Sequence, residues 1–389
     1  MANAAGCSRE YFATLIQRQV LGVGPAERYP PHPQPLSQVG ARGADLRATV
    51  LDKLQEAGLK VSKDRLAEII QAFTGVELLV IGDLILDSYL ECRALGVANE
   101  APVPLVEIQS ERQRAGGAGN VATNLARLGV QTQLVAPLGD DRESAQLKQN
   151  LTDAGIGFHP LVVRRPIPHK TRIMSGKHYY LRLDEEQAEP LTEEETVSLT
   201  EIIQKAWGRP AAVLVSDYDK GTVTPSLIQW IESQAQQAKL PIYADLKPRN
   251  ATQWRNLSLI TPNLSEAREL FGKLQPESSV PEEPADLASA LSKQFSSPVV
   301  LKMSEQGLLA VDRSSTLCRL DALTQHPVNV SGAGDTVFAT LSAALAVGAT
   351  LEKAAVLANV AASLAVAQEV THAVSAQELL DAVSRYQTV

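Results

Sequence analysis

Leu78-Leu79-Val80-Ile81-Gly82-Asp83 is the stretch that decides the fold of this chain. Four consecutive apolar residues ended by a glycine and an acid are typical of a strand that is buried on both faces of a parallel sheet. Similar apolar runs recur at 133–136, 211–216, 241–244, 258–261 and 298–301. Helical patterns separate most of them, at 121–128, 144–154, 226–238 and 265–271. This alternation predicts an α/β fold with a mainly parallel sheet between helices.

Two stretches break this rhythm. Residues 89–112 have alternating character and contain prolines, as edge strands do. Residues 158–183 alternate as well and are unusually basic, with Lys170, Arg172, Lys177 and Arg182. We predict that the two stretches form a small β-sheet that projects from the main sheet as a lid.

The beginning of the chain lies outside this pattern. Residues 1–43 are rich in proline and isolated glycines, a composition that predicts a disordered extension. A functional tail or a misassigned start codon would fit the same composition. From 44 to 75, apolar residues recur at helical spacing, which predicts two short helices. The main domain is therefore expected to span residues 76–389.

Composition argues against several classes of function. The chain has 389 residues, of which 44% are hydrophobic, enough for a sizeable core. A net charge of −8 argues against general binding to nucleic acid or membrane surfaces, because such partners need a basic face. Cys7, Cys92 and Cys318 are too few for a disulfide framework, and no apolar stretch has the length of a membrane span. We expect a reduced, cytoplasmic protein with no nucleic-acid or membrane partner.

A glycine-rich segment stands directly before a helix of small residues. Gly332-Ala333-Gly334-Asp335 leads into an apolar run that extends to about Val347. Glycines at this place leave the first backbone N–H groups of the helix free to bind an anion, and the helix dipole favours it. The aspartate can take the proton of an attacking hydroxyl while the amides stabilise a transferred phosphoryl group. Taken alone, the pattern fits an acid that only stabilises the helix dipole equally well.

A second cluster, Gly116-Gly117-Ala118-Gly119-Asn120, leads into a helix that ends at Gly129. Glycines in such number allow a backbone to approach a ligand closely. No Gly-Lys-Ser/Thr follows, so the cluster is not a Walker A loop. It follows the irregular lid-like stretch instead of the first strand, which disfavours a dinucleotide-binding fingerprint. Two such clusters in one chain favour ligand binding for both.

Together the two clusters resemble both signatures of the ribokinase-like (PfkB) carbohydrate kinase family, from about residue 76 to the C-terminus. Within that family the chain looks most like the heptose 7-phosphate kinases of lipopolysaccharide precursor synthesis, through the stretches 82–87, 100–104, 216–221, 261–266 and 304–307. The resemblance implies ATP and Mg²⁺ as cofactors. It also implies phosphorylation of D-glycero-D-manno-heptose 7-phosphate to the 1,7-bisphosphate.

The resemblance carries roles over to individual residues. It implies that Asp335 is the catalytic base and that Gly332, Ala333 and Gly334 stabilise the transferred phosphoryl group. The implied substrate-binding residues are Asp87, Gly116, Gly117, Asn120, Lys170, Arg172 and Asp217. The implied nucleotide-binding residues are Asn263, Glu266, Lys220, Ser304, Gly307 and Asn359. Of these, Asn263 and Glu266 are expected to face Mg²⁺ through water.

Simpler interpretations of these residues stay open. Asp87 fits a turn or capping acid, and Asn263 with Glu266 fits a helix N-cap and its capping-box partner. A lone Asn359 fits a packed helix residue. The basic residues of 158–183 fit a solvated face.

The chain departs from the family pattern at a few positions. Aspartate is usual where this chain has Asn329, and it helps to organise a monovalent-cation loop, so the use of such a cation is left open. Thr-Arg is usual where this chain has Lys302-Met303. The alternatives to a heptose phosphate kinase are another PfkB sugar or nucleoside kinase and a non-catalytic, kinase-like scaffold. The exposed edges of a lid sheet predict a homodimer.

Overall fold

A computed structural model describes residues 62–384 apart from 177, 315, 325 and 326. The extension expected at 1–43 and Lys177 lie outside the described residues. Of the helical segment expected at 44–75, the structure describes the part from residue 62, which holds α3 (Lys63–Gln71) and a 3₁₀ turn, η2 (Ala72–Gly75). Ser62 caps α3 by accepting a hydrogen bond from the Arg65 backbone N–H.

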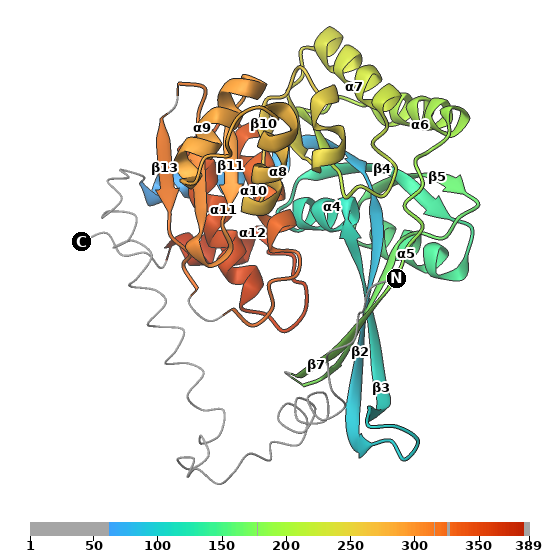
Figure 1. Ribbon diagram of the computed structural model, residues 1–389. Coiled ribbons are helices and arrows are strands. Elements are labelled where there is room, and N and C mark those ends of the chain that lie inside the picture. Colours follow the sequence, from blue (N-terminus) through green and yellow to red (C-terminus); the bar gives the residue numbers. More distant parts are fainter. Residues whose placement is uncertain (1–61, 177, 315, 325–326, 385–389) are drawn as a thin grey trace, which may run out of the picture.

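A large sheet forms the centre of the molecule (Figure 1). In chain order its strands are β1 (Glu77–Gly82), β4 (Gln131–Gly139), β5 (Gly157–Val163), β8 (Ala212–Ser216), β9 (Ile242–Asp245), β10 (Leu259–Ile260), β11 (Val299–Lys302), β12 (Leu308–Val311) and β13 (Leu317–Leu320). Their order across the sheet is β13-β12-β11-β10-β9-β8-β1-β4-β5. Neighbours from β5 to β11 pair in parallel, whereas β12 pairs antiparallel with β11 and β13. The predicted α/β fold is confirmed.

Helices cover both faces of this sheet (Figure 1). One core contains the buried residues of α3, α4 (Ala118–Arg127), α5 (Arg142–Asp153), α10 (Ala333–Ala346), α11 (Leu351–Val366) and α12 (Ala376–Ser384). The other contains those of α6 (Glu193–Ala206), α7 (Pro225–Ala238), α8 (Leu264–Leu274) and α9 (Pro284–Phe295). On β1, Leu78 and Val80 enter the first core while Leu79 and Ile81 enter the second. Burial on both faces explains why this strand is continuously apolar.

A second sheet projects away from the main one (Figure 1). It consists of β2 (Leu84–Val97), β3 (Pro104–Gly117), β6 (His169–Ser175) and β7 (His178–Glu185), in the order β3-β2-β6-β7. We call it the lid sheet. One part of the lid prediction is wrong: residues 158–163, expected in the lid, belong to β5 of the main sheet. Burial of Leu161 and Val163 in the core explains this, because the alternating pattern of 158–163 is that of a half-buried edge strand.

Two 3₁₀ turns, η3 (Pro248–Gln253) and η4 (Ser304–Gln306), follow β9 and β11. Both stand just after the carboxyl end of a parallel strand, where open α/β sheets bind their ligands. In the part of the chain that the structure describes, no helix combines the length and the apolar character needed to cross a membrane.

Candidate active site

Asp335 lies in the first turn of α10, with its side chain buried. The Asn120 amide, from the first turn of α4, donates a hydrogen bond to its Oδ2 over 2.7 Å. The hydroxyl of Tyr218, which follows β8, donates to its Oδ1 over 2.5 Å. Burial raises the pKa of Asp335 to about 6, and these two hydrogen bonds limit the rise. At neutral pH the carboxylate is mostly ionised and able to accept a proton.

Gly332 allows α10 to begin at this place. It is the N-cap residue, with a φ of 78° in the left-handed region that favours glycine. A Cβ atom there would stand 2.7 Å from the Asn120 amide nitrogen and 2.7 Å from Cγ2 of Thr371. Only a glycine therefore lets the helix start approach Asn120 this closely. Gly117, the N-cap of α4, is constrained in the same way, because its Cβ would stand 2.4 Å from the Asp83 carbonyl oxygen.

A cavity of about 550 Å³ opens beside the start of α10. Its lining includes most of the residues expected to bind the nucleotide, together with two residues of the glycine motif: Asn263, Glu266, Ser304, Gly307, Asn359, Ala333 and Gly334. Asn359 lies on α11 and donates to the Asp321 carbonyl over 2.9 Å, so it is also a packed helix residue. Gly307 has a φ of 86°, and a Cβ there would meet the Leu320 carbonyl oxygen. Its own backbone packing therefore requires a glycine at this place.

Asn263 and Glu266 form a capping box at the start of α8. The Asn263 side chain accepts from the Glu266 N–H over 2.9 Å, and Glu266 Oε2 accepts from the Asn263 N–H over 2.8 Å. Glu266 Oε1 is paired with the Lys247 ammonium. Burial alone would raise the pKa of Glu266, but the nearby Lys302 and Lys247 lower it below its ordinary value. The Glu266 carboxylate is therefore ionised. Asn263 and Glu266 cap α8 and line the cavity at the same time.

The donor set of the cavity fits magnesium. Asn263, Glu266 and Asp245 present side-chain oxygens along its lining, and Mg²⁺ prefers oxygen ligands while keeping several waters. Within the described ranges, no three His, Cys, Asp or Glu side chains gather as a direct metal cage. These residues therefore fit an ion that is held through its water shell.

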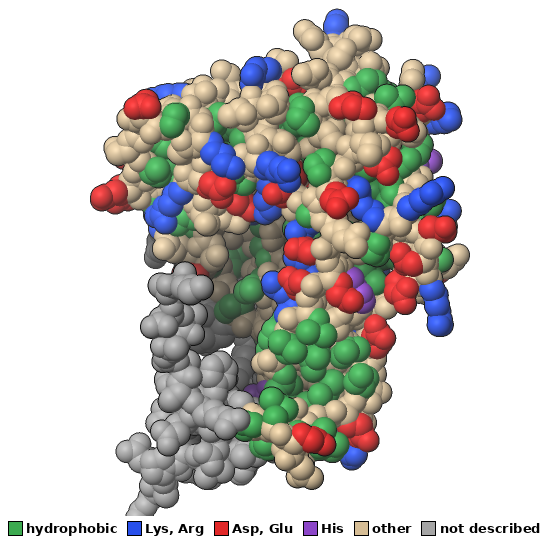
Figure 2. Space-filling model, turned by 45° about the vertical axis from the view of Figure 1, so that its right-hand side comes forward, with side chains coloured by type: hydrophobic (Ala, Val, Ile, Leu, Met, Phe, Trp, Pro, Cys, Tyr) green, Lys and Arg blue, Asp and Glu red, His purple; other side chains and the backbone are tan. Residues whose placement is uncertain are grey.

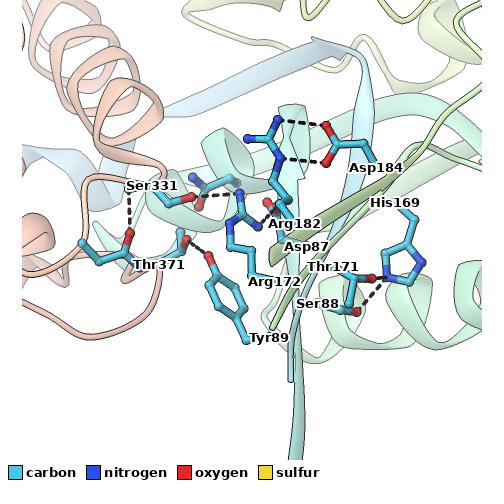
Figure 3. A network of polar contacts seen from close by, with 12 residues as sticks. Asp87, Ser88, Tyr89, His169, Thr171, Arg172, Arg182, Asp184, Ser331 and Thr371 are labelled. Atoms are coloured by element: carbon cyan, nitrogen blue, oxygen red, sulfur yellow. Dashed lines mark hydrogen bonds and ion pairs between the residues drawn. The ribbon is translucent and has the colours of Figure 1, made fainter. Parts of the chain in front are cut away.

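On the lid sheet, Asp87 of β2 and Arg172 of β6 form a largely buried ion pair of 2.5 Å (Figure 3). The same guanidinium donates to the Ser331 hydroxyl over 3.3 Å, next to Gly332. Arg172 also lies over the Tyr89 ring, 5.1 Å from its centroid. Lys170 is half-buried and stands opposite Asp87 in the β2–β6 register. Because Lys170 and Arg172 are two residues apart on β6, their side chains lie on the same face of the strand. The structure thus brings Asp87 and Arg172 beside the start of α10, with Lys170 opposite Asp87 on the neighbouring strand.

Gly116 gives Asp87 its space, because a Cβ at Gly116 would stand 2.3 Å from Asp87 Oδ2.

Asp217 and Lys220 lie in the loop after β8, and neither lines the cavity. Asp217 is buried, and its Oδ2 has no hydrogen-bond partner among the described residues. Burial, together with the nearby Asp83, raises the pKa of Asp217 to about 8. The Lys220 ammonium pairs with Glu186 over 2.8 Å, so in this structure its charge is directed at the segment that follows the lid.

Sequence reasoning missed four polar residues of this site: Tyr218, Asp245, Lys247 and Lys302. Lys302 pairs with both oxygens of Asp245, at 2.8 and 2.9 Å. Lys247 lies over the Tyr218 ring, 5.3 Å from its centroid. All four stand at or just after the carboxyl ends of β8, β9 and β11, and that position was the signal that could have found them.

Comparisons with known proteins agree with this geometry. Residues 77–377 match the family model described as pfkB family carbohydrate kinase. The chain is 37% identical over 308 residues to the bifunctional protein HldE of Methylobacillus flagellatus, covering 78% of this chain and 62% of that protein. It is 36% identical over 323 residues to HldE of Magnetococcus marinus, covering 80% and 65%. The chain thus spans less than two thirds of the length of these relatives.

Solved structures show the same fold at low identity. Phosphofructokinase-2 from Escherichia coli in complex with substrates and products has a TM-score of 0.65 and 19% identity, covering 79% of this chain and 98% of that one. Ribokinase from Arabidopsis thaliana complexed with ribose and ATP has a TM-score of 0.60 and 21% identity, covering 79% and 98%.

Proposed function

This chain belongs to the pfkB family of carbohydrate kinases, and from that premise we propose that it transfers the γ-phosphoryl group of ATP to a sugar phosphate. The observation that carries the proposal is the position of Asp335. Its buried carboxylate stands at the first turn of α10, where Ala333 and Gly334 line the cavity and the preceding Ser331 contacts Arg172. A base at this point can receive a proton from an acceptor bound on the lid side while a nucleotide lies in the cavity.

The residues around the cavity and around the Asp87–Arg172 pair have different proposed roles. Asp335 takes the proton from the attacking hydroxyl, and Asn120 and Tyr218 hold its carboxylate in place. The backbone at Gly332, Ala333 and Gly334 presents the positive end of the helix dipole to the transferred group. Magnesium would neutralise charge on the ATP phosphates, and Asn263 and Glu266 would hold it through water. Closure of the lid sheet excludes water and so limits ATP hydrolysis.

The acceptor that we propose is D-glycero-D-manno-heptose 7-phosphate, converted to the 1,7-bisphosphate for lipopolysaccharide precursor synthesis. Asp87 would bind a sugar hydroxyl, and Lys170 with Arg172 would bind the distal phosphate. Two observations support this choice. The stretches at 82–87 and 216–221 resemble those of heptose 7-phosphate kinases. The basic residues of β6 lie next to Asp87, the carboxylate that would bind the sugar. An unphosphorylated sugar would bring no anion for that strand.

A panel of acceptors tests the assignment. ATP consumption is measured in a coupled assay with heptose 7-phosphate, the unphosphorylated heptose, ribose, fructose 6-phosphate and a nucleoside. We expect turnover with the heptose phosphate and a KM that rises at least about tenfold in Arg172→Gln, the loss of one charge-assisted contact. Lys148→Gln, exposed on α5, is the matched control. Turnover with only unphosphorylated sugars would overturn the acceptor, and ATP binding without any phosphorylated product would favour a scaffold.

A further inference from the structure

Lys302 is the last residue of β11, and its charge is held inside the proposed nucleotide cavity. Its ammonium nitrogen contacts both oxygens of Asp245, at 2.8 and 2.9 Å. The side chain of Lys302 is 13% exposed and that of Asp245 is 11% exposed. The pair therefore lies in a largely desolvated place, where the cost of removing two charges from water offsets much of their attraction.

The end of the lysine side chain points to the start of α10. A Cβ placed on Gly334 would have as its nearest neighbours Nζ, Cδ and Cε of Lys302, at 3.4, 3.8 and 3.9 Å. A cation beside the positive end of a helix destabilises the fold instead of stabilising it. The pair with Asp245 offsets this cost in the folded chain, and an anion lying between the ammonium and the helix start would be attracted by both.

A second pair of the same kind stands next to it. Lys247 is bound to Glu266 in the same cavity, and the charge of Lys302 also acts on Glu266. Each lysine is thus paired with a carboxylate. An entering polyphosphate carries several negative charges, so it can compete with a single carboxylate for each ammonium.

Resting on the proposed function, we propose that Lys302 is a phosphate-binding residue, which Asp245 holds ready and which turns to the terminal phosphates of the nucleotide at the first turn of α10. Asp245 then acts as a positioning residue for the Lys302 ammonium.

Nucleotide binding without turnover tests this role. Titration calorimetry on the full chain, in EDTA so that no metal contributes, compares ADP with adenosine. Lys302→Gln is expected to weaken ADP binding by about tenfold or more, as the loss of one charge-assisted contact does, and to leave adenosine binding unchanged. Lys148→Gln, outside the cavity, is expected to bind both as the wild type does.

A second variant guards against misfolding. Lys302→Gln leaves Asp245 buried without its partner, whereas Lys302→Gln with Asp245→Asn replaces the ion pair by two neutral amides of similar shape. The double variant is expected to show the same selective loss of ADP affinity. Wild-type affinity for ADP in either variant would overturn the role of Lys302 and leave the kinase assignment intact. A wild-type chain that binds neither ADP nor ATP with magnesium would contradict the proposed function itself.

Discussion

Asp335 receives hydrogen bonds on both carboxylate oxygens, one from Tyr218 and one from Asn120. Burial raises its pKa to about 6 in spite of these two donors. A base works best when its pKa is close to the working pH, because it is then ionised and still basic enough to take a proton. In the proposed role the carboxylate must be ionised to accept a proton, so activity is expected to fall as the pH drops through about 6.

Tyr218→Phe should move this limb of the pH profile. The Tyr218 hydroxyl stabilises the ionised form of Asp335, so its removal raises the pKa of the carboxylate further. The acid limb of kcat/KM is therefore expected to shift to higher pH, with a smaller loss of rate at pH 8 than at pH 6. Tyr243→Phe, on β9 and outside the cavity lining, should keep the wild-type profile. A Tyr218→Phe profile that overlays that of the wild type would show that the hydroxyl does not act on Asp335.

Asn329 bridges two backbone segments through its amide. Its Nδ2 donates to the Glu369 carbonyl over 3.1 Å, and its Oδ1 accepts from the Ser331 N–H over 2.8 Å. The Asn329 amide thus links the two segments by hydrogen bonds alone. An aspartate at this position would place a carboxylate oxygen against the Glu369 carbonyl oxygen, and a cation would be needed between them. We expect wild-type stability and activity to be the same in potassium and in choline chloride.

Asn329→Asp tests that view. It places a carboxylate against the Glu369 carbonyl, and in choline chloride the variant is expected to lose about 1–2 kcal/mol of unfolding free energy. Potassium chloride should restore part of the lost free energy of unfolding. Thermal unfolding in the two salts measures the difference. Equal unfolding of the variant in both salts would contradict the account.

The local motifs made Asp335 and Asn120 predictable, because each belongs to a short glycine-rich segment that precedes a helix. Their contact joins residues 215 positions apart, and no local pattern reports it. Tyr218 and Lys302 escaped prediction for the same reason. Neither residue belongs to a glycine-rich segment that precedes a helix. They lie in the site because the parallel sheet brings several strand ends to one edge.

At the scale of the elements, β2 and β6 connect the lid sheet to the segments around the start of α10. Tyr89 of β2 shares a hydrogen bond of 2.6 Å with Thr371, in the segment before α12, while Arg172 of β6 reaches Ser331 (Figure 3). The lid sheet therefore contacts the loop before α10 as well as the segment before α12. A change of the lid position would therefore alter the contacts at the start of α10.

Gly116→Ala tests how closely β3 supports the acceptor site. The added methyl group would meet Asp87 Oδ2 at 2.3 Å, so the carboxylate must leave its position against Arg172. We expect a folded protein with a KM for the acceptor that is about tenfold higher and an unchanged KM for ATP, since one charge-assisted contact is lost. Steady-state kinetics measure both constants.

Gly272→Ala is the matched control, because a Cβ at that helical position has nothing within 4 Å. If Gly116→Ala kept the wild-type KM for the acceptor, Asp87 would have no role in binding it.

The strands of the sheet centre were predictable where they are buried on both faces, as β1 and β8 are. The edges were harder. The alternation of β5 also fits a lid strand, and only its pairing with β4 decides between the two places. The antiparallel strands β12 and β13 follow no helix, so the alternation of strands and helices did not reveal them.

At the scale of the whole molecule, the lid sheet carries exposed apolar side chains far from the core (Figure 2). We call these the lid patch: Leu95, Val97, Leu105, Ile108, Tyr179, Leu181 and Leu183. Exposed apolar groups gathered in this way are typical of protein interfaces. A second copy of the chain, paired lid to lid, would cover both the patch and the open strand edges.

Sedimentation velocity tests this arrangement. The wild type is expected to sediment as a dimer, and Leu181→Lys is expected to shift the equilibrium to monomer by at least tenfold, because a buried charge replaces an apolar contact. Val197→Lys, equally exposed but on α6, should leave the dimer intact. A wild-type chain that sediments only as a monomer would contradict the lid-to-lid pairing.

The proton transfer assigned to Asp335 can be tested most directly by phosphorus NMR of the product formed from ATP, magnesium and heptose 7-phosphate. The wild type is expected to give a new anomeric phosphate signal, and Asp335→Asn is expected to form it about 10²–10⁴-fold more slowly while binding ATP as the wild type does. Asp140→Asn, exposed after β4, should match the wild type. Product formed by Asp335→Asn at the wild-type rate would contradict the account.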